Sequence, residues 1–73
     1  MSKLEEVSWL RKVEKEIIEV LSNESEMTAP EIAEKTKHAI SYIYETLYRL
    51  ELKGVVERVW KFGAWYWRLK NEQ

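Results

Sequence analysis

The stretch EIAEKTKHAISYIYETLYRLELKG, residues 31–54, contains two short helical patterns and ends on a glycine. The second pattern predicts a helix over about 39–53, with an apolar inner face made of Ile40, Ile43, Leu47 and Leu50. Gly54 can adopt the left-handed conformation that often ends a helix. The stretch therefore predicts a helix-turn-helix, and the outer face of its last helix becomes the first candidate site.

The residues on either side of the turn support this division. Thr28 and Glu31 form a capping-box pattern ahead of a helix over about 29–36, and Pro30 falls within its first turn. Met27 and Thr28 are expected to pair as a very short strand. Lys37 occupies a turn position where a left-handed backbone would cost free energy.

A first helix over about 3–22 is predicted from apolar residues at helical spacing, with Ser2 and Glu5 as a capping box and Ser22–Asn23 as the stop. Its apolar arc covers about half of the helix, which is more than one core face requires. A second copy of the chain is the simplest additional contact, and a small domain that wraps this helix deeply is the alternative. The expected homodimer surface comprises Leu4, Trp9, Val13 and Val20.

After Gly54 the period of the apolar pattern changes from helical to alternating. VVERVW and WYWRL are rich in β-branched and aromatic residues, and KFGA separates them, which predicts a β-hairpin over about 55–70. Trp67 and Leu69 are expected in the core, and Trp60 or Trp65 on the surface. Three helices followed by a two-stranded hairpin make residues 1–73 a single α+β domain of the winged helix-turn-helix class.

The ordered pattern EIAEKT…IYETLYRLELKGVVERV…YWRL resembles the winged helix of small bacterial and archaeal transcription regulators of the PadR, MarR and ArsR kind, over about residues 28–70. That resemblance implies a third helix in the major groove, a wing on the DNA backbone or minor groove, and dimerisation through a terminal helix. A fainter resemblance links the chain to Z-DNA-binding winged helices, because Tyr48 and Trp67 fall where that family places its DNA-contacting aromatics. Tyr44 replaces the asparagine of that family, and its wing prolines are absent.

Charge is distributed unevenly along the chain. Residues 1–34 carry four basic and nine acidic side chains, whereas residues 35–70 carry eight basic and three acidic ones. A polyanion would therefore be attracted to the second half and repelled by the first. The chain has no cysteine, a single histidine, and no apolar run of membrane-spanning length. No metal, cofactor or membrane partner is expected, and the charged start without a signal-peptide core predicts a cytoplasmic, nucleoid-associated protein.

Sequence-specific binding of double-stranded DNA is the predicted function. The expected base-reading residues on the third helix are Ser41, Tyr44, Glu45 and Tyr48. The expected DNA-backbone contacts are Lys35, Lys37, His38, Tyr42, Arg49, Arg58, Lys61 and Arg68. The alternative is a protein-interaction module that uses the tyrosine-rich face and the wing tryptophans, since tyrosine is enriched at protein interfaces. No catalytic triad or phosphate-binding glycine loop is present, so an enzyme is not expected.

Overall fold

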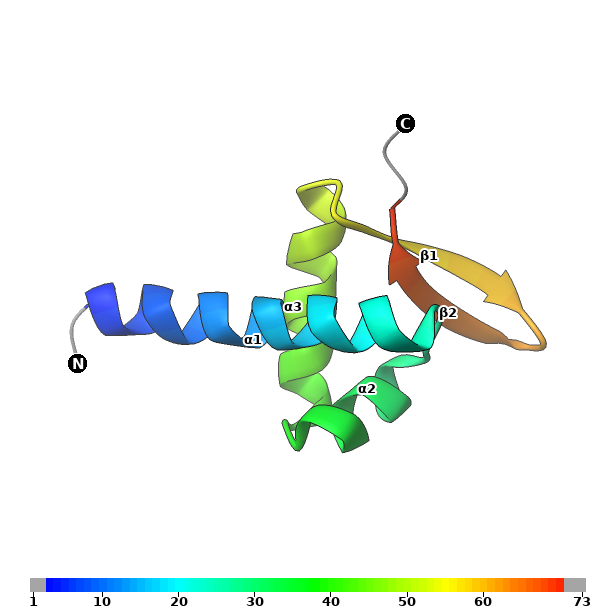
Figure 1. The fold of residues 1–73 in the computed structure, drawn as a ribbon, viewed down its shortest axis with the longest axis horizontal. Helices are drawn as coiled ribbons and strands as arrows, with labels where there is room; N and C mark the ends of the chain where they lie inside the picture. The colour runs from blue at the N-terminus through cyan, green and yellow to red at the C-terminus, as the bar shows by residue number, and fades with distance from the viewer. Residues whose placement is uncertain (1–2, 71–73) are drawn as a thin grey trace.

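The computed structural model describes the backbone of residues 3–70 and the side chains of residues 11–70. Its elements, in chain order, are α1 (Lys3–Glu24), α2 (Ala29–Thr36), α3 (Ile40–Leu52), β1 (Val56–Lys61) and β2 (Ala64–Leu69). Figure 1 shows α1 crossing α3, with α2 at one end of α3 and the antiparallel hairpin projecting to one side. The expected winged helix-turn-helix architecture is confirmed. None of the described helices is long and apolar enough to cross a bilayer.

The helix boundaries follow local chemistry. The hydroxyl of Thr28 accepts a hydrogen bond from the Glu31 N–H, and the Glu31 carboxylate accepts one from the Thr28 N–H, so the predicted capping box of α2 is present. The predicted stop of α1 at Ser22–Asn23 is two residues too early. Ser22 stays in the helix and its hydroxyl donates to the Ile18 carbonyl, and the helix ends only where Ser25 turns to a positive φ of 74°.

The hairpin is tied to the chain between α1 and α2. Met27 and Trp67 exchange two backbone hydrogen bonds of 3.0 and 2.7 Å, so the short strand expected at Met27 forms against β2. Cross-strand partners share a face of the hairpin, and the register pairs Arg58 with Trp67 and Lys61 with Ala64. One face, which we call the inner face, carries Val56, Arg58, Trp60, Trp65, Trp67 and Leu69; the outer face carries Glu57, Val59, Lys61, Ala64, Tyr66 and Arg68.

The core lies where α1, α2, α3 and the inner face meet, and Trp67 is its largest side chain. The predicted inner position of Ile40 is wrong: Ile40 begins α3 and is 43% exposed. Thr46 takes an inner position instead, and its hydroxyl donates to the Tyr42 carbonyl at 2.9 Å. The sequence placed Trp67 and Leu69 against the core correctly, and Trp60 and Trp65 are both exposed as expected.

The expected dimer surface on α1 needs one correction. Val13 is completely buried against this domain's own core, so it cannot belong to a surface that meets another chain. Val20 is partly buried and packs at the edge of the core. The side chains of Leu4 and Trp9, and the capping box of Ser2 and Glu5, lie outside the described residues.

Candidate nucleic-acid interface

The outer face of α3 is formed by residues that alternate with its buried stripe. Ile43, Thr46, Leu47 and Leu50 face the core, which turns Ser41, Tyr42, Tyr44, Glu45 and Tyr48 to solvent. The Tyr44 and Tyr48 rings stack with centroids 5.9 Å apart. All four residues expected to read bases are therefore exposed together on one side of the helix.

The inner face of the hairpin continues this surface past the core. The Arg58 guanidinium carbon lies 5.3 Å from the Tyr48 ring centroid and 5.5 Å from that of Trp65. Trp65 in turn meets Trp60 edge to face, with centroids 5.1 Å apart. A continuous surface therefore runs from α3 to the wing; we call it the α3–wing surface, and it comprises Tyr44, Tyr48, Arg58, Trp60 and Trp65.

Arg58 is fixed in this surface by a carboxylate from the end of α3. Its Nε and Nη2 donate to the two Glu51 oxygens at 3.0 and 3.1 Å. These hydrogen bonds raise the pKa of Arg58 above its ordinary value, so the group stays cationic while its flat face covers Tyr48 and Trp67. The sequence predicted Arg58 as a DNA contact but gave no sign of Glu51, because no local pattern links residues seven apart across a helix end and a strand.

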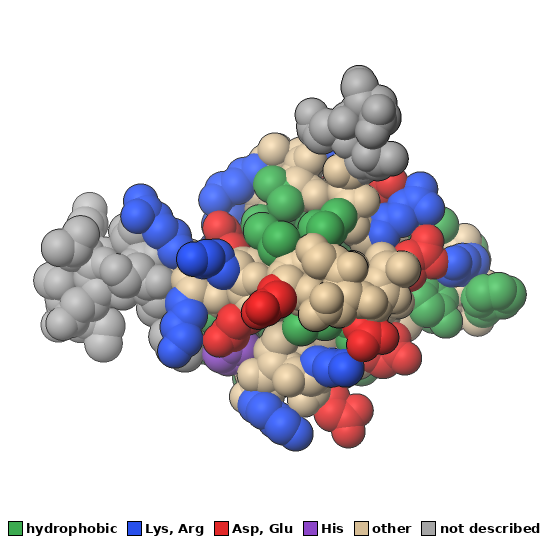
Figure 2. All heavy atoms as spheres, in the orientation of Figure 1, with side chains coloured by type: hydrophobic (Ala, Val, Ile, Leu, Met, Phe, Trp, Pro, Cys, Tyr) green, Lys and Arg blue, Asp and Glu red, His purple; other side chains and the backbone are tan. Residues whose placement is uncertain are grey.

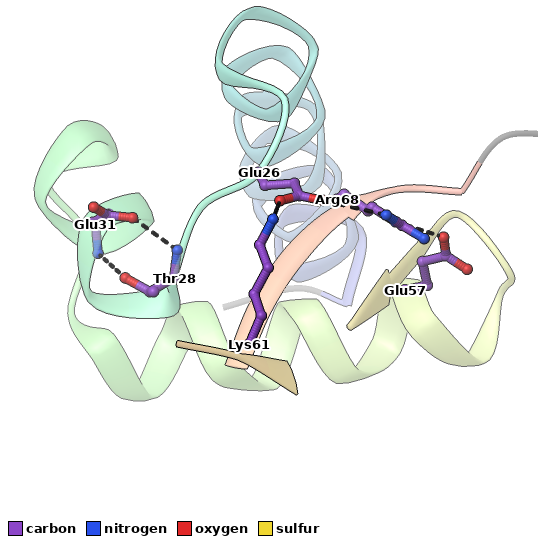
Figure 3. A network of polar contacts seen from close by, with 6 residues as sticks. All are labelled: Glu26, Thr28, Glu31, Glu57, Lys61 and Arg68. Atoms are coloured by element: carbon purple, nitrogen blue, oxygen red, sulfur yellow. Dashed lines mark hydrogen bonds and ion pairs between the residues drawn. The ribbon is translucent and has the colours of Figure 1, made fainter. Parts of the chain in front are cut away.

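Lys61 and Arg68 are not brought together with α3. Both lie on the outer face of the hairpin, and both donate to the Glu26 carboxylate at the start of the α1–α2 connection (Figure 3). Arg68 also donates from Nε to Glu57 at 2.7 Å. The two cations therefore form an ion-pair network on the side of the wing opposite to Arg58.

Most of the other predicted backbone contacts pair with carboxylates of α1. Lys35 Nζ lies 3.1 Å from Glu24, and His38 Nε2 lies 2.6 Å from Glu16. Arg49 was expected on the outer face of α3, but it is partly buried and its Nε turns toward Glu14, 3.7 Å away. Lys37 is exposed, and within the described residues it forms no ion pair.

Figure 2 shows basic and acidic side chains interspersed over the face that carries α1, and apolar side chains gathered at the far end of the hairpin. Phe62, one of the aromatic residues that stand between basic residues in the wing sequence, is exposed in the turn between β1 and β2. Among residues 11–70, no group of three metal-ligating side chains could hold an ion.

The structure is similar to that of the Zalpha domain of PKZ from Carassius auratus, solved in complex with Z-DNA, with a TM-score of 0.77, 23% identity, and coverage of 82% of this chain and 95% of that one. At this identity the similarity shows the winged-helix fold. No curated protein matches the chain. A family model described as the sugar-specific transcriptional regulator TrmB matches residues 4–62. Since that match spans most of the sequence, the chain belongs to the TrmB family of winged-helix transcription regulators.

Proposed function

We propose that this chain binds double-stranded DNA sequence-specifically as a transcription regulator, with α3 in the major groove and the wing beside it. The observation that carries the proposal is the α3–wing surface, which joins the exposed helix face to a fixed cation on the hairpin. A helix and an adjoining hairpin are elements that fit neighbouring grooves of a duplex. Membership of a regulator family supports the same conclusion.

The residues of α3 have distinct roles in this proposal. Ser41 and the hydroxyls of Tyr44 and Tyr48 donate or accept hydrogen bonds at base edges, and the tyrosine rings pack against thymine methyl groups. Glu45 accepts a hydrogen bond from the cytosine amino group and disfavours phosphate. Tyr42 lies toward the start of the helix, where its hydroxyl suits a phosphate oxygen.

In this proposal, the main phosphate contacts come from the cations Arg58 and Lys37, which lie near the exposed face of α3. Arg58 is oriented by Glu51 through its Nε and Nη2 and lies over Tyr48, so its Nη1 can bind a phosphate while the pair with Glu51 stays intact. Lys37 is exposed at the turn that leads into α3. Lys35, His38 and Arg49 would first have to exchange a carboxylate of α1 for phosphate, which reduces their net contribution.

Fluorescence anisotropy of a labelled mixed-sequence duplex, at about 50 and 200 mM salt, tests the proposal. Micromolar or tighter binding that weakens steeply with salt is expected, and sequence selection then identifies the preferred site. Arg58→Gln should reduce the slope of log affinity against log salt by about one unit. Lys15→Gln is the matched control, because Lys15 is exposed on α1, which contacts no DNA in this proposal, and its slope should stay that of the wild type.

Two results would contradict the proposal. No binding at the lower salt concentration would exclude a DNA footprint, and equal slopes for wild type and Arg58→Gln would remove the α3–wing surface from it. A left-handed alternating C–G duplex belongs in the same titration, because the similar Zalpha structure holds Z-DNA. Preference for that duplex would exclude sequence-specific reading of a right-handed major groove.

A protein-interaction module is the second candidate, and the composition of the same surface favours it. Tyrosine, tryptophan and arginine are the residues most enriched at the energetic centres of protein interfaces, and the α3–wing surface consists of these types alone. Five of the seven other lysines and arginines of residues 35–70 form ion pairs. Binding to a protein partner that is insensitive to salt and lost in Tyr48→Ala, without any binding to DNA, would favour this candidate.

A further inference from the structure

Phe62 forms the tip of the wing in a backbone conformation that phenylalanine rarely adopts. The turn between β1 and β2 consists of Phe62 and Gly63, with φ angles of 57° and 73°. Two positive φ angles define the type I′ hairpin turn, which favours Asn or Gly at its first position. A bulky residue there strains the backbone, so this turn would fold more readily with asparagine at position 62.

Packing within the domain does little to offset this strain. Phe62 is 87% exposed. Its ring meets the edge of Tyr66, with centroids 6.3 Å apart, and the Lys61 ammonium lies 5.7 Å from its centroid. Neither contact buries the ring, so a large apolar group is presented to solvent at the end of a projecting hairpin.

The chemistry around the tip suits a nucleic acid. Residues 60–66 contain four aromatic side chains, one lysine and no carboxylate. Trp60 and Trp65 are exposed on the inner face, which also carries Arg58, whereas the Phe62 ring at the tip lies against Tyr66 and Lys61 of the outer face. The Lys61 ammonium is held by Glu26, so what residues 60–66 themselves present is mainly aromatic, and it suits the flat faces of bases.

We propose that Phe62 enters the minor groove next to the major groove occupied by α3 and wedges between two base pairs, partly unstacking them and kinking the duplex. This rests on the proposed DNA-binding function. Phe62 lies four residues beyond Arg58, roughly 13 Å along a strand. Adjacent major and minor grooves on one side of a duplex lie about half a helical repeat, roughly 17 Å, apart. The strand and the ring together span that distance, and apolar wedges of this kind kink DNA toward the major groove.

Phe62→Asn provides a sharp test, because asparagine suits the turn but cannot act as a wedge. The variant should melt at the wild-type temperature or above it. Its affinity for the selected duplex should fall about tenfold, which corresponds to about 1.4 kcal/mol. Energy transfer between dyes at the two duplex ends should show bending by the wild type and loss of the bend in the variant, with the salt slope unchanged because no phosphate contact is removed.

Leu52→Gln is the matched control. Leu52 is 90% exposed at the end of α3, away from the wing tip, so its replacement removes an exposed apolar side chain while affinity and bend stay those of the wild type. If the wild type binds duplex DNA and Phe62→Asn binds and bends it equally well, the wedge is overturned and the proposed function stands. If the wild type binds no duplex, the proposed function itself fails.

Two other results would also overturn the wedge. A large drop in the melting temperature of Phe62→Asn would assign the ring to the stability of the fold. Sedimentation of the wild type, but not the variant, with phosphatidylcholine vesicles, without any difference in DNA bending, would assign the tip to a lipid surface.

Discussion

Lys37 ends α2 in the left-handed conformation, with φ 64° and ψ 28°, and its N–H donates to the Ala33 carbonyl at 2.8 Å. The position therefore has the geometry that usually selects glycine at a helix end. A lysine in this conformation costs about 1–2 kcal/mol of backbone strain. Glycine removes that strain, but part of the gain is offset because glycine has more conformational freedom in the unfolded chain. We expect Lys37→Gly to raise the free energy of unfolding by about 0.5–1 kcal/mol, measured by urea denaturation.

A glycine introduced one turn earlier in α2, at Glu34, provides the control for Lys37→Gly. Glu34 is an exposed residue in the right-handed interior of α2, so Glu34→Gly should lower the free energy of unfolding by about 1 kcal/mol. If both variants lost stability, the turn would not impose a left-handed backbone at Lys37. The change in the free energy of unfolding should be positive for Lys37→Gly and negative for Glu34→Gly. Because both variants introduce a glycine, this difference in sign cannot come from a general effect of glycine.

At the scale of elements, the wing is positioned by a backbone bridge and by charge. Met27 joins the edge of β2, and the neighbouring Glu26 accepts hydrogen bonds from Lys61 on β1 and Arg68 on β2. One carboxylate therefore holds both strands against the connection between α1 and α2 (Figure 3). The α3–wing surface depends on how the hairpin is oriented relative to α3. The Glu26 network helps to hold that orientation from the outer face of the hairpin, opposite to the α3–wing surface.

The network makes stability depend on pH. Lys61 donates a hydrogen bond that lowers the pKa of Glu26, partial burial opposes this effect, and Arg68 adds to the lowering. A carboxyl group with a lowered pKa in the folded state stabilises the fold above its unfolded pKa and loses that contribution as pH falls through its folded pKa. The Tm of wild type should therefore exceed that of Glu26→Gln most clearly above pH 4.5, and the difference should shrink as pH falls below that value.

A second carboxylate variant separates this effect from general acid titration. Glu19 is exposed on α1, and within the described residues it forms no ion pair. Glu19→Gln should therefore follow the wild-type dependence of Tm on pH. A Glu26→Gln curve that runs parallel to wild type at every pH would show that Glu26 does not titrate differently in the folded state.

Local patterns predicted the elements, but not which groups meet across them. The bounds of α2 and the hairpin follow from a capping box and a change of period, both of which are signals within a few residues. The exposure of Ile40 depends on where the neighbouring elements end, and the turn of Arg49 toward Glu14 depends on how α1 crosses α3. The sequence correctly placed the tyrosines of α3 on its exposed face. Arg58 and Lys61 lie three residues apart on β1, so strand alternation puts them on opposite faces, and the register then places Arg68 on the face of Lys61.

At the scale of the whole molecule, folding cancels much of the charge asymmetry of the sequence. Carboxylates from α1 and the connection after it pair with cations of the second half, as in Glu24 with Lys35, Glu14 with Lys53 and Glu26 with Lys61. The basic half is therefore not a free polycationic surface. DNA must either bind cations such as Arg58 and Lys37 that face away from α1, or displace these carboxylates, so attraction by net charge contributes less than the sequence suggests.

The length of α1 supports a homodimer, which we propose as the form that binds DNA. The helix has 22 residues, about 33 Å, and its first turns extend past α3 with no other described element beside them (Figure 1). Leu4 and Trp9 belong to these turns in the sequence, whereas Val13 packs in the core.

We expect light scattering to give twice the monomer mass for the wild type at micromolar concentrations, and the monomer mass for Trp9→Glu. Lys15→Ala, at an exposed position of α1, is the control and should stay dimeric. Because a two-fold dimer reads inverted half-sites about 10 base pairs apart, or a multiple of that spacing, Trp9→Glu should also lose preference for paired over single half-sites. A wild type that stays monomeric at every concentration and binds single half-sites equally well would contradict this assembly.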